Sequence, residues 1–256
     1  MAYPVTVQGS PGFEKSTTTS AKHRVGQKME LPDGRVFFYG YTGEAITAGK
    51  LCMTTATSSG HIKDLAVAAA AAADATQIKV TNATTAITGS GAYTGDFATR
   101  GDYQDGYVFV NDAAGEGQVW QIKDHSTAAS SGTITIDFYD NDVVATALTT
   151  SSEVGLAKNP YNSVEVWDLS DIDGPCIGVP NRDIASGSYG WFQTKGYAAV
   201  LTNGTFVVGK NVMTGSTTDG SGDVMADDSS AEFLIGGVVN VGATTEYSLV
   251  DLNIRG

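Results

Sequence analysis

The sequence predicts an all-β protein, mainly antiparallel, with a barrel or sandwich core, an inserted β-rich subdomain and an extended N-terminal arm. Glycine and threonine are abundant, with 31 and 30 copies among 256 residues, whereas only 17% of residues are charged and 6 are proline. Threonine favours strands and glycine favours turns, so this composition disfavours a helical bundle. Short apolar runs bounded by Gly and Asp recur along the chain, as in sandwiches and barrels.

The first 28 residues differ from the rest in charge and pattern. They are rich in Pro, Gly, Ser and Thr and lack apolar periodicity. Four cations stand against one carboxylate, a net charge of +3, whereas the remaining 228 residues carry −16. We expect an extended arm that docks on an acidic surface, its own or a partner's, or else a solvated tail. Its removal should leave the β fold intact. The candidate docking residues are Lys15, Lys22, Arg24 and Lys28.

The core is expected to comprise residues 29–63 and 161–256. Residues 29–39 read as a hairpin, because the Pro-Asp-Gly sequence ending at Gly34 sets both corners of a turn. The next strand turns at Gly49. The string Gly-Lys-x-x-Met-Thr at residues 49–54 recurs at 209–214, which indicates two β units with equivalent roles.

An inserted subdomain is predicted at residues 64–160. Its alanine-rich stretch, residues 64–75, reads as a helix, since alanine is the best helix former and Asp64 suits an N-cap. Residues 77–81 alternate as a strand, and residues 106–139 as a three-strand meander.

The C-terminal part returns to short strands separated by Gly and Asp. The strands expected there are residues 176–179, 189–194, 198–201, 205–208, 233–239 and 247–254.

Composition also limits the function. The formal charge of −13 disfavours a general nucleic-acid binder, because phosphate contacts need many cations. Neither a signal peptide nor an apolar segment of about 18 residues occurs, so we expect neither secretion nor membrane insertion. Cys52 and Cys176 are too few for a disulfide framework and are expected to be free thiols.

No motif for chemistry is convincing. Residues 204–210 have the glycine and lysine spacing of a phosphate-binding loop, but Asn211 replaces the magnesium-binding Ser or Thr. The acidic stretch 219–228 lacks the ligand pattern of an EF-hand and reads as a solvated loop. We therefore predict no catalytic residue, cofactor or metal site. Three scattered histidines have no metal-ligand spacing and are expected to be ordinary surface residues: His23, His61 and His125.

Three long strings carry a family resemblance. They are residues 105–125, residues 149–161 and residues 189–201, the last reading Tyr-Gly-Trp-Phe-Gln-Thr-Lys-Gly-Tyr-Ala-Ala-Val-Leu. These strings resemble head structural proteins of tailed bacteriophages, and in particular capsid decoration, or cement, proteins. The resemblance extends over about residues 29–256 and does not depend on the arm.

The resemblance implies a non-enzymatic virion protein that is made in the host cytoplasm and binds the outer face of the major capsid protein shell. It implies stabilisation of that shell and a homotrimer, with no nucleic acid or membrane partner. Two other classes stay open: a tail or head-fibre adaptor, and a carbohydrate-binding module. The module would need exposed tryptophan rings as stacking platforms, the candidates being Trp120, Trp167 and Trp191.

Overall fold

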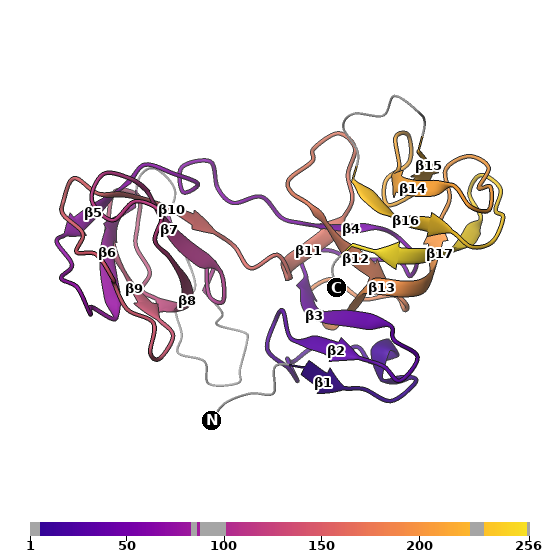
Figure 1. The fold of residues 1–256 in the computed structure, drawn as a ribbon, viewed down its shortest axis with the longest axis horizontal. Coiled ribbons are helices and arrows are strands. Elements are labelled where there is room, and N and C mark those ends of the chain that lie inside the picture. The colour runs from indigo at the N-terminus through magenta and orange to yellow at the C-terminus, as the bar shows by residue number, and fades with distance from the viewer. Residues whose placement is uncertain (1–5, 83–85, 88–100, 226–232, 255–256) are drawn as a thin grey trace. The chain divides into compact units, whose positions relative to one another are not determined.

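The computed structural model describes residues 6–82, 86–87, 101–225 and 233–254, and it confirms the predicted all-β class. The described residues form strands β1 to β17 and one short 3-10 helix, η1, with no α-helix among them (Figure 1). The chain divides into two compact units. Unit 1 comprises Met1–Thr55 and Pro160–Gly256, and unit 2 comprises Ala56–Asn159.

Unit 1 is built on one sheet of 11 strands in the order β1-β2-β3-β11-β4-β12-β13-β17-β16-β14-β15. An additional pairing of β3 with β13 closes β3, β11, β4, β12 and β13 into a ring, so the core of the unit is a barrel. Most pairs are antiparallel, but β1 runs parallel to β2 and β11 parallel to β3. The elements of the first segment are β1 (Thr6–Gln8), η1 (Phe13–Lys15), β2 (Lys28–Glu30), β3 (Val36–Thr42) and β4 (Cys52–Thr54). Those of the second are β11 (Asn162–Val166), β12 (Cys176–Pro180), β13 (Tyr189–Leu201), β14 (Asn211–Thr214), β15 (Gly222–Val224), β16 (Leu234–Val238) and β17 (Tyr247–Asn253).

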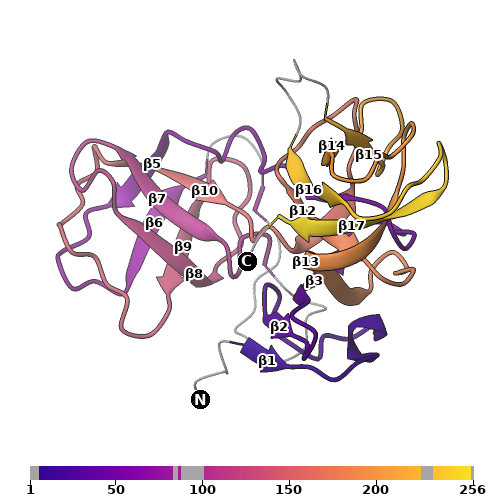
Figure 2. The ribbon, with the colours of Figure 1, turned by 45° about the vertical axis from the view of Figure 1, so that its right-hand side comes forward.

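Unit 2 is a closed barrel in the order β10-β5-β6-β9-β8-β7, and Figure 2 shows its strands surrounding one interior. The predicted meander is confirmed, because β7 pairs with β8 and β8 with β9. The unit begins at Ala56, whereas the sequence placed the boundary at residue 64. The reason is His61, whose side chain lies buried among unit 2 residues. The strands are β5 (Leu65–Ala69), β6 (Gln77–Thr81), β7 (Tyr107–Asp112), β8 (Val119–His125), β9 (Thr133–Phe138) and β10 (Glu153–Ala157).

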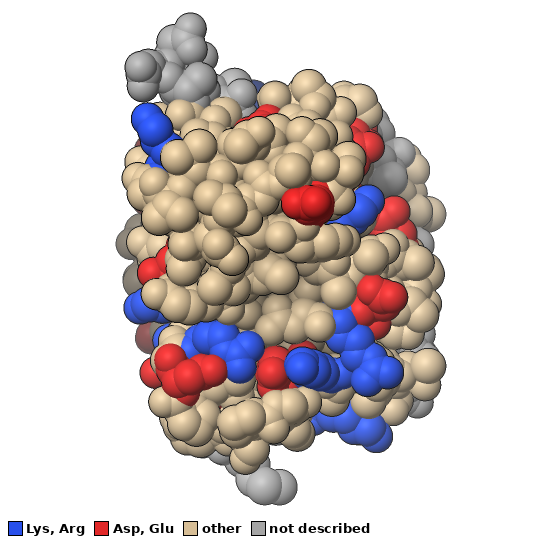
Figure 3. Space-filling view, turned by 90° about the vertical axis from the view of Figure 1, so that its right-hand side faces the viewer, with Lys and Arg blue, Asp and Glu red and all other residues tan. Residues whose placement is uncertain are grey.

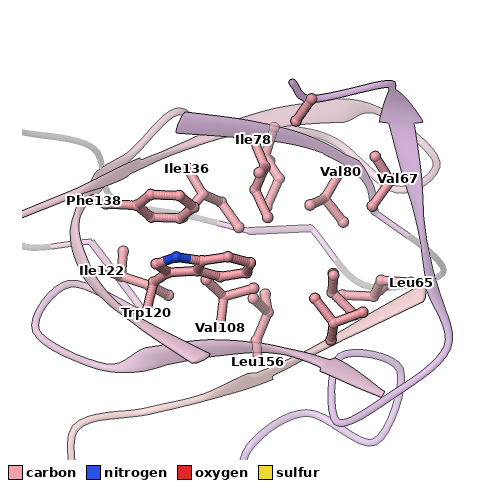
Figure 4. Close-up of a cluster of buried hydrophobic side chains, with 14 of the residues drawn as sticks. Leu65, Val67, Ile78, Val80, Val108, Trp120, Ile122, Ile136, Phe138 and Leu156 are labelled. Carbon is pink, nitrogen blue, oxygen red and sulfur yellow. The ribbon is translucent and has the colours of Figure 1, made fainter. Parts of the chain in front are cut away.

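The interior of the unit 2 barrel is filled by aliphatic side chains around one aromatic pair (Figure 4). The ring of Trp120 stacks on that of Phe138, with centroids 4.8 Å apart and planes 7° from parallel. The indole N–H of Trp120 donates to the carbonyl of Val143 at 2.9 Å. Trp120 thus fills the barrel with its rings and satisfies its one polar atom.

The predicted alanine-rich helix is wrong. Residues 65–69 form strand β5, which pairs with β6 and β10. Leu65 and Val67 are buried and alternate with exposed alanines, which is a strand period and not a helical one. Ala71 forms a bridge with Leu148, and Asp74 has a positive φ of 67°. An isolated helix of this length is marginal, so pairing in the barrel overrides the propensity of alanine.

Connecting loops that bond to other segments through backbone hydrogen bonds recur in both units. Within unit 1, the two similar strings at residues 49–54 and 209–214 occupy equivalent positions in two such loops. Gly49 and Gly209 both have positive φ, 78° and 83°. The Gly49 N–H donates to Pro180 at the end of β12, and the Gly209 N–H donates to Val238 at the end of β16. The predicted equivalence of the two strings is therefore confirmed.

The bridges beside these turns correct one predicted strand. Three residues before each glycine, Ile46 bridges to Ile184 and Phe206 bridges to Gly242. The expected strand at residues 205–208 is part of this paired loop, and β14 begins only at Asn211. Unit 2 contains the same kind of paired loop, because Ala71 bridges to Leu148 and the Asp74 N–H donates to the carbonyl of Val144 at 2.8 Å.

We predict that Trp120→Ala lowers the free energy of unfolding of unit 2 by about 3–5 kcal/mol, because the substitution leaves a cavity at the centre of the barrel. Urea titration followed by amide hydrogen exchange in β8 and β9 measures this change. Trp120→Phe keeps most of the ring volume and serves as the control, with a smaller loss. Equal losses for both variants would contradict the assignment of the loss to the cavity, because phenylalanine leaves a much smaller one.

Candidate binding surfaces

The N-terminal segment, residues 6–28, is folded onto unit 1, so it is not a solvated tail but docks on the chain's own surface. β1 pairs with β2, and Thr18 exchanges two backbone hydrogen bonds with Tyr189 at 2.8 and 3.1 Å. The rings of Phe13 and His23 lie 6.1 and 5.1 Å from that of Trp191. Removing the segment would uncover the ring of Trp191, which is 1% exposed, so we expect unit 1 to lose stability.

The docking of this segment uses contacts that its net charge did not indicate. Its only carboxylate, Glu14, is 4% exposed and lies 3.6 Å from the guanidinium of Arg35. The Glu14 carboxylate also accepts the N–H of Gly12 at 2.6 Å. One ion pair and an aromatic cluster therefore hold the segment together with its backbone hydrogen bonds, whereas Lys15 and Lys22 stay exposed.

The four predicted docking cations lie in different environments. Lys15, at the end of η1, and Lys22 are exposed, whereas Arg24 and Lys28 are half-buried. Lys28 belongs to β2, where it lies opposite Phe38. Figure 3 shows Lys and Arg gathered with some carboxylates in a band across the lower part of one face of unit 1, at the height of β1 and β2.

The upper part of the same face carries few charged side chains (Figure 3). Three valines of the paired loops that precede β14 and β17 are exposed: Val207 by 51%, Val208 by 58% and Val241 by 63%. Because Phe206 bridges antiparallel to Gly242, Val207 lies opposite Val241. We call these three residues the valine patch.

Sequence reasoning missed the valine patch because it assigned residues 205–208 to a strand. The Gly-Lys turn was the available signal, since the same string at residues 49–54 was already interpreted as a turn. In the structure Phe206 is fully buried, and the two valines after it lie in the turn and point outward.

All three tryptophans are buried, which contradicts their role as sugar-stacking platforms. Trp120, Trp167 and Trp191 are 3%, 1% and 1% exposed. The rings therefore cannot stack on a ligand in solution.

Two of the three histidines are buried, contrary to the expectation of surface positions. His61 and His125 in unit 2 are each 2% exposed. The main-chain N–H of Tyr103 donates to Nε2 of His125 at 3.1 Å, and Nδ1 of His125 lies 3.1 Å from the carbonyl of Ser126. Nε2 must therefore be unprotonated, with the proton on Nδ1 donated to that carbonyl.

His61 forms the second half of this buried polar cluster. Its Nδ1 lies 2.6 Å from the hydroxyl of Tyr103, and its Nε2 lies 2.7 Å from Oδ1 of Asn82. The Asn82 amide nitrogen donates to Ala129, which leaves Oδ1 to accept from His61. Burial raises the pKa of the Tyr103 hydroxyl, which therefore stays neutral. These bonds satisfy polar groups inside unit 2 and offer no accessible nucleophile.

The cysteines and the acidic loop have structural roles. Cys52 and Cys176 are both free thiols, as predicted, and burial raises the pKa of the Cys52 thiol. In the acidic stretch, Asp223 accepts from Asn203 at 2.9 Å and from the Ser216 hydroxyl at 2.7 Å. Residues 226–232, the end of that stretch, lie outside the described residues.

Within the described part of the chain, no group of three or more His, Cys, Asp or Glu side chains has a metal-binding arrangement. None of the described helices is long and apolar enough to cross a membrane. No protein-family model, curated protein or solved structure matches this chain.

We predict that deletion of residues 2–24 destabilises unit 1 and shifts tryptophan emission to longer wavelength, because Trp191 loses its contacts with Phe13 and His23. The expected loss of unfolding free energy is about 1–3 kcal/mol. Fluorescence-detected urea titration measures both effects. The double variant Lys15→Ser and Lys22→Ser is the control, since it removes charge and keeps the aromatic contacts. Unchanged stability after the deletion would contradict this account.

We also predict that unit 2 loses stability at acidic pH through His125. Burial lowers the pKa of His125 below its ordinary value of 6.5, against opposing effects of the Ser126 carbonyl, Asp102 and Asp124. The unfolded chain therefore binds the proton more readily. The stability is complete above pH 6.5 and falls as the pH drops through 6.5 toward the folded value.

Hydrogen exchange in β8 and β9, compared between about pH 7.5 and about pH 5, measures this effect. His125→Gln should reduce the pH dependence, because glutamine does not titrate. His23→Gln is the control: burial also lowers the pKa of His23, but His23 lies in unit 1. A pH dependence of unit 2 that His125→Gln leaves unchanged would contradict the assignment.

Proposed function

We propose that this chain is a structural virion protein that decorates the outer face of a capsid shell and stabilises it. The observation that carries the proposal is the valine patch, three exposed apolar side chains on two paired loops of unit 1. Specific protein interfaces combine a desolvated apolar centre with a polar rim, and the valine patch could provide such a centre. The three sequence strings that resemble phage head proteins favour the major capsid protein as the partner.

The proposed role is non-enzymatic and depends on repetition. Three exposed valines provide only a small apolar contact, but a shell presents many equivalent sites, and association into a homotrimer would multiply the contacts of each bound molecule. The exposed Lys15 and Lys22 would add charged contacts with the shell, and such charges mainly set the association rate and orientation. The acidic remainder of the chain would keep decorated particles dispersed.

Cryo-EM of particles from cells that express the chain tests the proposal. We expect its density at repeated positions over the outer shell, with threefold clusters of copies. Density confined to the tail or to head fibres would instead assign the chain as an adaptor. The absence of the chain from purified particles would overturn a virion role altogether. Light scattering of the purified chain tests the homotrimer separately.

We predict that Val207→Asp with Val208→Asp lowers particle occupancy by about tenfold or more, because two charges would be buried without partners at the interface. Occupancy is measured by quantitative mass spectrometry of purified particles. Val119→Asp is the matched control, because Val119 in unit 2 is 58% exposed, the same as Val208. Lys15→Glu with Lys22→Glu should reduce occupancy more at low salt than at high salt. Full particle occupancy by the double valine variant would exclude the valine patch as the surface that binds the capsid shell.

A further inference from the structure

A groove of about 910 Å³ crosses the exposed face of the unit 1 sheet, apart from the valine patch. Its floor includes Gly236 and Gly237 on β16. One side is the turn of the first hairpin, where Arg35 packs against Gly196 of β13. We call this site the glycine groove.

The strand register explains why the groove is hollow. Tyr197 lies opposite Asp251, Asp251 opposite Gly237, and Gly237 opposite Asn211, so one row of four residues crosses four strands. The third position of this row has no side chain, which leaves a depression between larger neighbours. At Gly236 a Cβ would lie 2.0 Å from the carbonyl oxygen of Asp251, so only glycine fits.

The groove presents an aromatic ring together with mixed hydrogen-bonding groups. Tyr197 is 55% exposed on one wall. Among the described residues, the polar groups of these lining side chains have no hydrogen-bond or ion-pair partner: Lys195, Tyr197, Asn211, Asp251 and Asn253. The two amides both donate and accept, the carboxylate accepts, and the ammonium donates.

The charges of the groove balance, which disfavours a polyanionic ligand. Arg35 and Lys195 stand against Asp33 and Asp251. The Arg35 guanidinium is already engaged, because it donates to Asp33 at 2.7 Å and lies 3.6 Å from Glu14. A phosphate-rich strand would therefore find one lining cation without an ion-pair partner among the described residues, Lys195, in a groove that also holds the Asp251 carboxylate.

We propose that the glycine groove binds a saccharide. Sugar hydroxyls donate and accept at once, which matches the amides and the carboxylate, and the apolar face of a pyranose ring suits the exposed ring of Tyr197. An open groove with a glycine floor admits a chain of several sugar units, whereas a closed pocket would select a single small molecule. This site involves none of the three tryptophans and does not rest on the proposed decoration role.

The test is a titration of the full chain, labelled with ¹⁵N, with cellohexaose, maltohexaose, chitohexaose, mannohexaose and a heparin hexasaccharide. We expect one or more of the neutral sugars to shift the amide signals of Gly236, Gly237 and Tyr197. Tyr197→Ala and, separately, Asp251→Asn should weaken the binding by about tenfold or more.

Tyr107→Ala is the matched control, because Tyr107 lies on β7 of unit 2 and is 43% exposed. This variant should bind like the unsubstituted chain. Three results would overturn the proposal: no shift with any neutral sugar, tight binding of the heparin fragment alone, or shifts that Tyr107→Ala abolishes and Tyr197→Ala does not. Shell occupancy of Tyr197→Ala should equal that of the unsubstituted chain, so failure of the groove and failure of the decoration role are distinguishable.

Discussion

Backbone hydrogen bonds between paired loops are the constraint on which both units depend. In three places a residue with positive φ donates its N–H to a carbonyl of a distant segment: Gly49 to Pro180 and Gly209 to Val238, both at strand ends, and Asp74 to Val144 in the loop between β9 and β10. All three bonds join segments separated along the chain, so they fix connections that local turn chemistry alone would leave open. Gly49 is buried, so its bond also satisfies a backbone group that water cannot reach.

The same pairing determines which side chains are left for binding. Phe206 enters the core at the bridge, and the turn that follows forces Val207 and Val208 outward. The valine patch is therefore a consequence of the loop geometry and sits on a rigid base. Rigid presentation lowers the ordering cost of association, which matters for a surface whose individual contacts are few. The glycine groove is equally built into the sheet, since its floor is set by register and not by a mobile loop.

The N-terminal segment shows how net charge and local contact can diverge. Its excess of cations was evident in the sequence, but the groups that hold it in place are Glu14, Phe13 and His23. A charge count reports on the surface of a segment, whereas burial depends on which few side chains face the core. In the folded segment the Glu14 carboxylate is buried and lies 3.6 Å from the guanidinium of Arg35, whereas Lys15 and Lys22 remain exposed.

The sequence by itself determined the all-β class, the hairpin at Gly34, the meander of β7 to β9 and the equivalence of the turns at Gly49 and Gly209. Each of these depends on neighbours along the chain, through alternation or turn residues. Only the tertiary structure decided that the alanine-rich stretch is a strand, that His61 and His125 are buried, and that Tyr197, Asp251 and Asn211 meet across Gly237. These outcomes depend on register between distant strands, because a shift of one residue would turn each side chain to the opposite face.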